Sequence, residues 1–304
     1  MTREEILKDM HKEIRRNQRE KNVAFNTNPS IARIEPFKIA DNLYYVGDKK
    51  VCIHLIDSGD GLILIDSGYL GATHLLIDSI WRAGFDPKNV RWIIHSHGHS
   101  DHFGASNEFK NMFGTKLAIS RVDAEKLKNT KTEYIDKESF PYARVPEFDY
   151  EIEDGEIFEL GNVKIRCVLT PGHTDGVLSF FFDVTYNGEK YLAGMFGGAG
   201  INAIKLTYLC STNSPDAPEK MLNSIDSIIN EPVTVHLGNH PGNNDTLLKR
   251  EKQLNEGGNP FIDANSWRNF LNGLKEKIKS IIKDNEALEK EISEMIKNRW
   301  YTKS

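Results

Sequence analysis

Cysteine is scarce in this 304-residue sequence, and the few that occur lie far apart. The three are Cys52, Cys167 and Cys210. An odd number of widely spaced cysteines argues against a disulfide framework and favours a reducing compartment, so we expect a cytoplasmic protein. The spacing also excludes a zinc knuckle made from neighbouring cysteines.

Excess positive charge and long apolar runs are missing as well. The formal net charge is −5, which leaves no basic footprint for nucleic acid. The apolar runs are no longer than single strands, so we expect no membrane span. The N-terminal stretch MTREEILKDMHKEIRRNQRE is charged throughout and has no apolar region of the kind that a secretory signal contains. We therefore predict neither a nucleic-acid nor a membrane partner.

Short strands and helices follow one another along the chain. Residues 2–21 have the apolar spacing of a helix, and the sequence NTNPS ends it. From about residue 36, apolar strands are separated by glycine and aspartate turns, and LGNVK and YNGEK are typical of hairpin turns. Further helices are predicted at 71–84, 104–114, 121–129, 218–230 and, as one helix or two, 263–300. The pattern divides into two similar halves, which favours a mixed α/β sandwich of two sheets covered by helices.

The run HSHGHSDH, at residues 95–102, is the main chemical feature of the sequence. Two histidines spaced two apart on an extended segment point to the same side, and His97 and His99 fit this spacing. Asp101 and His102 follow after the chain turns, so they can face a second point nearby. A register that begins at His95 places no carboxylate at the matching position, so His95 is predicted to be surplus.

Two further ligands must come from elsewhere, because two ions with three protein ligands each need six. His173, in TPGHT, and His240, in GNHPG, both lie in tight turns at predicted strand ends. A lone loop histidine is usually a polar surface residue, but together with the run these two gain weight. His236 is a rival to His240, yet its position within a strand favours a structural role.

The ordered motifs resemble the metallo-β-lactamase superfamily. His97-x-His99-x-Asp101-His102 is followed by PGHT and NHPG, and the earlier LILIDSG resembles the strand that ends in an aspartate, here Asp66, which supports the metal loop. The resemblance implies an αββα sandwich with the metals at one edge between its halves. It covers about residues 37–245, so we expect helical extensions at 1–36 and 246–304.

One departure narrows the resemblance. Most hydrolases of the superfamily carry an aspartate that bridges the two ions, whereas this sequence has YLAGMFGGAG there, with Met195 near the expected place and no cysteine instead. That pattern is similar to the third lactamase subclass. The resemblance then implies two zinc ions per chain. The first would be held by His97, His99 and His173, and the second by Asp101, His102 and His240.

The resemblance implies hydrolysis of an amide or ester bond in a small molecule by metal-bound hydroxide, as in a β-lactamase. Asp101 would be both a ligand of the second ion and the catalytic residue that orients the hydroxide. Ser96 and Ser100 either fix imidazole tautomers or are simple turn residues. The first alternative is a cytoplasmic housekeeping hydrolase for another ester, lactone or amide, and the second is a non-catalytic scaffold protein.

Two further segments each allow two interpretations. The aromatic residues of 130–150 either wall the pocket or form a satellite cluster under a loop; they are Tyr134, Phe140, Tyr142, Phe148 and Tyr150. Apolar residues from Trp267 to Met295 recur at spacings of four and three, with a polar interruption at Asn285. This period is typical of a coiled coil and predicts a homodimer through the C-terminal helix, unless the helix packs on its own domain.

Overall fold

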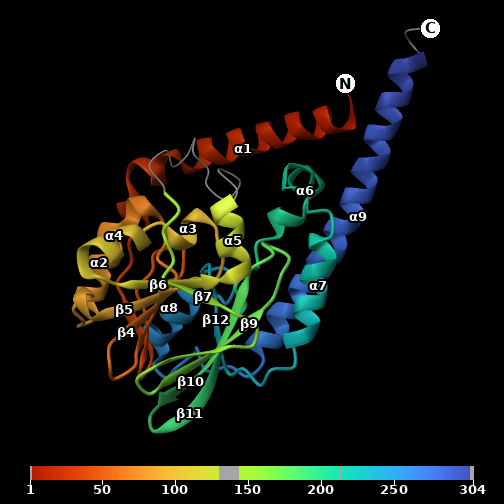
Figure 1. Ribbon diagram of the computed structural model, residues 1–304. Helices are drawn as coiled ribbons and strands as arrows, with labels where there is room; N and C mark the ends of the chain where they lie inside the picture. The colour runs from red at the N-terminus through yellow and green to blue at the C-terminus, as the bar shows by residue number, and fades with distance from the viewer. Residues whose placement is uncertain (1, 130–143, 213, 302–304) are drawn as a thin grey trace.

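The computed structural model of the protein describes residues 2–129, 144–212 and 214–301. Two β-sheets face each other, and helices cover their outer faces (Figure 1). The predicted αββα sandwich is therefore confirmed. No helix among the described residues is at once long enough and apolar enough to cross a membrane.

The first sheet has seven strands in chain order. They are β1 (Phe37–Ala40), β2 (Leu43–Tyr45), β3 (His54–Asp57), β4 (Leu62–Ile65), β5 (Val90–Ile94), β6 (Lys116–Ser120) and β7 (Tyr150–Ile152). Neighbours from β1 to β4 pair antiparallel, whereas those from β4 to β7 pair parallel. The carboxyl ends of β4, β5 and β6 consequently meet at one edge of the sheet.

The second sheet has five strands, in the order β12, β11, β10, β9, β8. Their bounds are β8 (Ile157–Leu160), β9 (Val163–Leu169), β10 (Leu178–Tyr186), β11 (Glu189–Met195) and β12 (Val235–Leu237). β8 to β11 pair antiparallel and β12 pairs parallel with β11, so β9, β11 and β12 run the same way. Both predicted hairpin turns are present, with positive φ at Gly161, Asn187 and Gly188.

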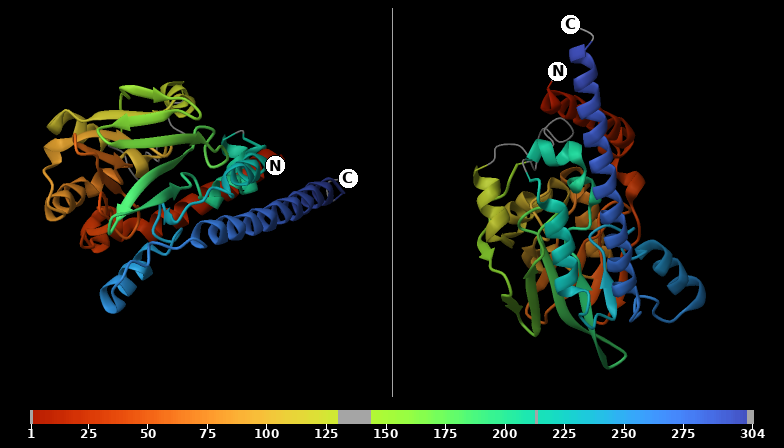
Figure 2. Two further views of the ribbon diagram at one scale, coloured as in Figure 1. Left: turned by 90° about the horizontal axis from the view of Figure 1, so that it is seen from below. Right: turned by 90° about the vertical axis from the view of Figure 1, so that its right-hand side faces the viewer.

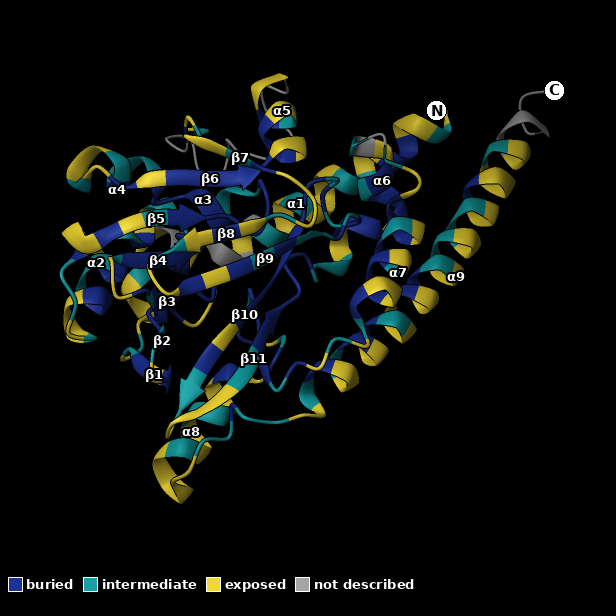
Figure 3. Cartoon of the chain, turned by 60° about the horizontal axis from the view of Figure 1, so that its bottom comes forward, coloured by how far each residue is buried: buried dark blue, intermediate teal, exposed yellow. Residues whose placement is uncertain are grey.

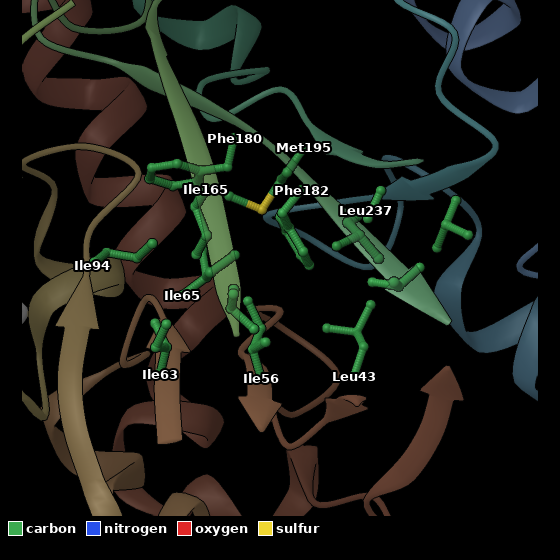
Figure 4. Close-up of a cluster of buried hydrophobic side chains, with 14 of the residues drawn as sticks. Leu43, Ile56, Ile63, Ile65, Ile94, Ile165, Phe180, Phe182, Met195 and Leu237 are labelled. Carbon is green, nitrogen blue, oxygen red and sulfur yellow. The ribbon is translucent and has the colours of Figure 1, made fainter. Parts of the chain in front are cut away.

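The alternation of side chains along each strand separates a central core from two outer layers. In β10, Phe180 and Phe182 point inward to the core between the sheets, whereas Phe181 belongs to the layer under the outer helices. Figure 4 shows residues of both sheets meeting in this core. Those labelled are Leu43, Ile56, Ile63, Ile65, Ile94, Ile165, Phe180, Phe182, Met195 and Leu237. Period-two alternation is what allows one strand to serve two layers.

Helices cover the outer faces. On the first sheet lie α2 (Thr73–Arg82) and α4 (Ser106–Phe113), whose apolar sides pack on the outward residues of β4 and β5. On the second sheet lie α7 (Ala217–Ile228) and α9 (Ser266–Tyr301). Figure 3 shows both sheets largely buried and the helices exposed on their outer sides. The short α3 (Ser100–Phe103) and α5 (Arg121–Asn129) lie at the end of the sandwich that α1 crosses (Figure 1).

The N-terminal helix α1 (Arg3–Thr27) packs beside α6 (Leu206–Thr212) and the far part of α9. Ile6 and Leu7 of α1 form a small buried cluster with Leu206 and Ile292. The two termini therefore lie near each other, beyond one end of the sandwich (Figures 1 and 2). α1 is longer than the predicted helix and ends at Asn28, just before the proline of NTNPS.

The 3.5-residue seam of the C-terminal helix packs against its own chain. Trp267 to Ile281 lie in the layer over the second sheet, and Ile292 lies in the cluster with α1. The polar interruption is also used internally, because the Asn285 amide accepts from Leu206 N and donates to the Ile204 carbonyl. A period of 3.5 residues thus serves intramolecular packing here.

The segment after residue 245 also contributes to the centre of the protein. It begins with α8 (Thr246–Glu256), and Phe261 then enters the core between the sheets. Ile262 forms an isolated antiparallel bridge with Val235 of β12. The division of the chain at residues 36 and 245 remains a prediction.

Buried histidines away from the ligand motifs make acid stability a test of the fold. His236 is 1% exposed and lies against Trp267 and Phe270. Burial lowers its pKa to about 3, so between that value and its unfolded pKa only the unfolded chain takes up the proton, and stability falls as pH falls. In metal-free protein the free energy of unfolding should fall between pH 7 and pH 5. We expect this fall to be about 2 kcal/mol smaller in His236→Phe than in the parent protein.

Urea unfolding at the two pH values measures this difference. His74→Gln is the matched control, because His74 is exposed on α2 and should leave the pH dependence unchanged. An equal loss of stability in His236→Phe and the parent protein would contradict the prediction.

Candidate metal centre

The fold brings all six predicted ligands to the edge where strands of both sheets end. His97 and His99 follow β5, while Asp101 and His102 lie on α3. His173 follows β9 in the second sheet, and His240 follows β12. They form two groups of three within which the ligand atoms lie within 4.8 Å of one another: His97, His99 and His173, and Asp101, His102 and His240. These are the two sets that the motif resemblance implied.

The first group joins three ring nitrogens. His99 Nδ1 lies 3.1 Å from His97 Nε2 and 2.9 Å from His173 Nε2. The His97 ring is fully buried, whereas the other two are partly accessible. Ligands from both sheets therefore meet at one point.

The second group joins a carboxylate and two ring nitrogens. Asp101 Oδ2 lies 3.5 Å from His102 Nε2 and 3.7 Å from His240 Nε2. His102 is fully buried, but the His240 side chain is 38% exposed and that of Asp101 22%. This group opens to solvent on the side of His240, which gives a small molecule access to the site.

Hydrogen bonds fix the tautomers of two imidazoles in the first group, His97 and His173. The Ser96 hydroxyl donates its one hydrogen to Asp66 Oδ2 at 2.8 Å, so at 3.0 Å it accepts from His97 Nδ1. His173 Nδ1 likewise donates to the Gly200 carbonyl at 2.8 Å. The Nε2 atoms of His97 and His173 therefore carry lone pairs, as metal ligation requires.

The second group is fixed in the same way. His102 Nδ1 donates to Asp66 Oδ2 at 2.8 Å, and His240 Nδ1 donates to the Lys50 carbonyl at 2.7 Å. Both Nε2 atoms are left to face Asp101. His102 Nε2 is buried and makes no hydrogen bond. A buried polar atom without a hydrogen bond is costly unless something else satisfies it, and a cation beside Asp101 would do so.

The residues therefore fit metal ions in both groups. In the first group three ring nitrogens converge, and the one hydrogen that His99 Nδ1 can offer satisfies only one of its two neighbours. Burial, and then the neighbouring imidazoles, lowers the pKa of His97 and His99 well below the usual value, and burial lowers that of His173 to about 4. Neutral imidazoles at pH 7 are the form that binds a metal.

The electrostatics of the second group differ from those of the first. Burial works against the charge of Asp101, but nearby His102 and His240 outweigh it and hold the pKa of this carboxyl at about 2. Burial lowers the pKa of His102, yet the charges of Asp101 and Asp66 raise it above its usual value. Two carboxylates beside one imidazole thus favour positive charge between Asp101 and His102, which is where a cation would lie.

Asp66, the predicted supporting residue, holds both groups. It follows β4 and has the left-handed φ of 63°, which is uncommon for a residue other than glycine. Its carboxylate is fully buried and accepts from Ser96 N at 2.7 Å, as well as from the Ser96 hydroxyl and His102 Nδ1. Of the two interpretations of Ser96, the structure favours the one in which it orients an imidazole. Ser100 begins α3.

The histidines outside the six do not join either group. His95, predicted to be surplus, is fully buried and contacts the Ala118 carbonyl through Nδ1 at 2.8 Å and Ser106 Oγ through Nε2 at 2.7 Å. His236 contacts Ser266 Oγ through Nδ1 at 3.1 Å. None of these contacts involves one of the six candidate ligands.

The glycine-rich segment after β11 lets the backbone approach His173. A Cβ on Gly200 would lie 2.4 Å from the His173 ring, and one on Gly198 would lie 2.9 Å from the His173 side chain. The Gly200 carbonyl can therefore reach His173 Nδ1. Sequence reasoning missed the carbonyl acceptors of Gly200 and Lys50, because a backbone acceptor leaves no signal in the sequence.

The structure describes two of the five aromatic residues of 130–150 that were predicted either to wall the pocket or to form a satellite cluster. Tyr134, Phe140 and Tyr142 lie outside the described residues. Phe148 packs on the His95 ring and with the clusters on the outer face of the first sheet, and Tyr150 of β7 is exposed beside Trp92. For these two residues the structure favours the satellite cluster over the pocket wall.

Comparison with known proteins agrees with this geometry. Residues 47–185 match the family model described as the metallo-beta-lactamase superfamily. The solved structure of the FEZ-1 metallo-beta-lactamase from Legionella gormanii is 29% identical, with a TM-score of 0.75, over 84% of this chain and 98% of that one. BJP-1, a subclass B3 metallo-beta-lactamase of Bradyrhizobium japonicum, is 25% identical, with a TM-score of 0.75, over 84% and 97%.

One relative with a curated description matches a shorter part of the chain. Glyoxylase B2 of Dictyostelium discoideum is 31% identical over 93 residues, which is 30% of this chain and 32% of that protein. The matched stretch thus spans about a third of that relative's length. Two facing sheets, two triads of candidate ligands at their common edge and these similarities agree: residues 47–185 match the metallo-beta-lactamase superfamily, and the fold is that of the metallo-beta-lactamases.

The register of the histidine run can be tested by removing one ring at a time. We expect His95→Ala to keep both metal ions, because the ring nitrogens of His95 contact Ala118 and Ser106 and none of the six candidate ligands, although it should lose about 2–3 kcal/mol of stability with its buried contacts. His97→Ala should lose the first ion. Metal content per chain after gel filtration distinguishes the two variants, and metal loss from folded His95→Ala would show that the register is wrong.

Proposed function

We propose that the protein is a binuclear zinc hydrolase that cleaves an amide or ester bond in a small molecule, as β-lactamases do. The observation that carries this proposal is the pair of ligand triads, one of three imidazoles and one of Asp101, His102 and His240, side by side at an edge that opens to solvent. Imidazoles with one carboxylate suit zinc, and this donor set contains no thiolate.

Zinc ions bound in the two triads would supply a nucleophile from water near neutral pH and polarise the carbonyl of the substrate. His97, His99 and His173 would hold one ion and the second triad the other. The chain's own contribution is to keep the imidazoles of the first triad neutral by burial, and to orient imidazoles of both triads through the buried carboxylate of Asp66 and the carbonyls of Gly200 and Lys50.

Asp101 has a second role in this proposal. Its carboxyl has a pKa of about 2, so it is ionised at neutral pH. An ionised carboxylate at the accessible edge can bind an ion through one oxygen and accept a hydrogen bond from the attacking water through the other. Asp101 is therefore the residue that we propose orients the nucleophile.

A second candidate is a housekeeping hydrolase for a different ester, lactone or amide, without appreciable β-lactamase activity. The similarity to Glyoxylase B2 favours it, because this relative is not named as a lactamase. The structural similarity to FEZ-1 and BJP-1 covers nearly the whole of those chains and favours the first candidate. Fold and ligands are common to both candidates, so only the substrate separates them.

We also propose a cytoplasmic setting for the enzyme. Three free cysteines, two of them buried, support a reducing compartment such as the cytoplasm. A homodimer through α9 would need a surface other than the 3.5-residue seam, because Leu271, Ile281 and Ile292 of that seam pack within the chain. Light scattering at micromolar concentration tests the dimer directly.

Metal removal tests the proposed activity. We expect about two zinc ions per chain, and cephalosporin hydrolysis that is lost in chelator and restored by zinc. Two ions without turnover of a cephalosporin would favour the housekeeping hydrolase, and a panel of esters and lactones would then identify its substrate class. Less than one ion per chain would contradict both candidates.

Substitution of Asp101 tests its catalytic role. Asp101→Ala should lower kcat by at least about 100-fold, because both a ligand and the group that orients the nucleophile are lost. Asp175→Asn is the matched control, since its carboxylate lies near the site but pairs with Lys126 and Lys220. A variant Asp101→Ala that turns over at the parental rate would contradict the proposed role.

A further inference from the structure

Asp123 is a second buried carboxylate at the metal edge, and its hydrogen bonds go to neighbours of the six candidate ligands and not to the ligand side chains themselves. It lies in the first turn of α5, just after β6, and is 1% exposed. Neither the run of histidines nor the turn motifs of the sequence point to it. A buried carboxylate on a surface helix needs partners, and those of Asp123 identify its role.

The three hydrogen bonds of the Asp123 carboxylate come from two different loops. Oδ2 accepts from Gly98 N at 2.7 Å, and Gly98 lies between His97 and His99. Oδ2 also accepts from the Thr174 hydroxyl at 2.8 Å, and Oδ1 accepts from Gly176 N at 3.0 Å. Thr174 directly follows His173, so one carboxylate holds the loops that carry all three ligands of the first group.

Both backbone donors are glycines, and the structure shows why. A Cβ on Gly176 would lie 2.5 Å from Asp123 Cγ, and one on Gly98 would lie 3.3 Å from Asp123 Oδ2 and 3.1 Å from Leu127. Any larger residue at 176 would push the carboxylate away. The close approach of two loops to one carboxylate is thus built into the backbone.

The two loops belong to different sheets. Gly98 follows β5 of the first sheet, whereas Thr174 and Gly176 precede β10 of the second. The position of His173 relative to His99 therefore depends on contacts that cross between sheets. Leu178 N also donates to the Ser96 carbonyl at 2.8 Å, and Asp123 adds side-chain contacts to residues directly beside the ligands.

We propose that Asp123 is a positioning residue for the first metal-binding triad, because its buried carboxylate fixes the loop of His97 and His99 against the loop of His173. Asp66 orients His97, through Ser96, and His102 within the first sheet, and Asp123 sets the distance between ligands of the two sheets. This inference rests on the proposed metal-dependent function, but its test measures metal affinity and not turnover.

Asp123→Asn tests the proposal with almost no change in volume. The amide has one oxygen in place of two, so whichever way it faces, its NH2 group opposes the N–H of Gly98 or of Gly176. We expect the affinity of the first triad for zinc to fall by about 10–100-fold, as for other residues that support metal ligands. The second triad has no partner in common with Asp123 and should keep its affinity.

Single-site backgrounds separate the two ions. His240→Ala leaves the first triad intact, and His173→Ala leaves the second. Zinc affinity measured by competition with a chromophoric chelator should fall on addition of Asp123→Asn to His240→Ala, but should stay within about threefold on its addition to His173→Ala. Asp175→Asn is the control, because it removes a carboxylate from the same loop, where Asp175 pairs with Lys126 at 3.0 Å and Lys220 at 2.8 Å.

A purely structural role for Asp123 would give a different result. In that case Asp123→Asn would lower the melting temperature in chelator yet bind zinc as the parent does, or weaken both sites equally, and either result overturns the proposal. Should Asp123→Asn fail to fold, Thr174→Val removes one donor only and should weaken the first triad alone by a smaller factor. A Thr174→Val variant whose first triad binds zinc with unchanged affinity would also overturn the proposal.

These outcomes are distinct from failure of the proposed function. Parent protein that binds two zinc ions without hydrolysing any ester or amide would overturn the activity and leave the role of Asp123 standing. Parental affinity in Asp123→Asn would overturn the role of Asp123 and leave the activity standing. Parent protein that binds no zinc would overturn both.

Discussion

The candidate metal centre depends on the hydrogen bonds of one buried carboxylate, that of Asp66. Its two oxygens accept from the backbone and hydroxyl of Ser96 and from His102 Nδ1, and the Ser96 hydroxyl in turn orients His97. One side chain thereby determines which nitrogen of two imidazoles carries the lone pair, one in each triad. Asp66 has a left-handed backbone conformation, which is strained for a residue other than glycine, and the hydrogen bonds of its carboxylate help to hold it there.

The same principle extends to the ligands that come from loops of the second sheet. His173 and His240 have no carboxylate partner at Nδ1 and use the carbonyls of Gly200 and Lys50 instead. Glycine at 198 and 200 is needed so that the backbone can come this close to His173. Backbone carbonyls therefore orient His173 and His240, whereas the side chains of Ser96 and Asp66 orient His97 and His102.

Away from the edge with the candidate metal triads, the terminal helices α1 and α9 cover parts of the sandwich. The apolar stripe of α9 packs over the second sheet and then against α1, and Asn285 supplies hydrogen bonds to the segment that leads into α6. A heptad period alone cannot distinguish a partner helix in another chain from the surfaces of the same chain, because both offer apolar area at the same spacing. The tertiary structure shows that its own chain covers this stripe.

The sequence by itself determined the fold class and the six candidate ligands, because strand periodicity, glycine turns and the spacing of His97, His99, Asp101 and His102 are all local signals. His95 could be set aside from the same local spacing, because a register that begins there places no carboxylate at the matching position. The division of His173 and His240 between the two triads followed from the resemblance and not from local spacing, and the structure groups them as it implied. Only the tertiary structure decided which carbonyls fix their tautomers, and that Asp123 joins loops from the two sheets. Such contacts link residues as far apart as Lys50 and His240, and nothing in the local pattern of either residue records the other.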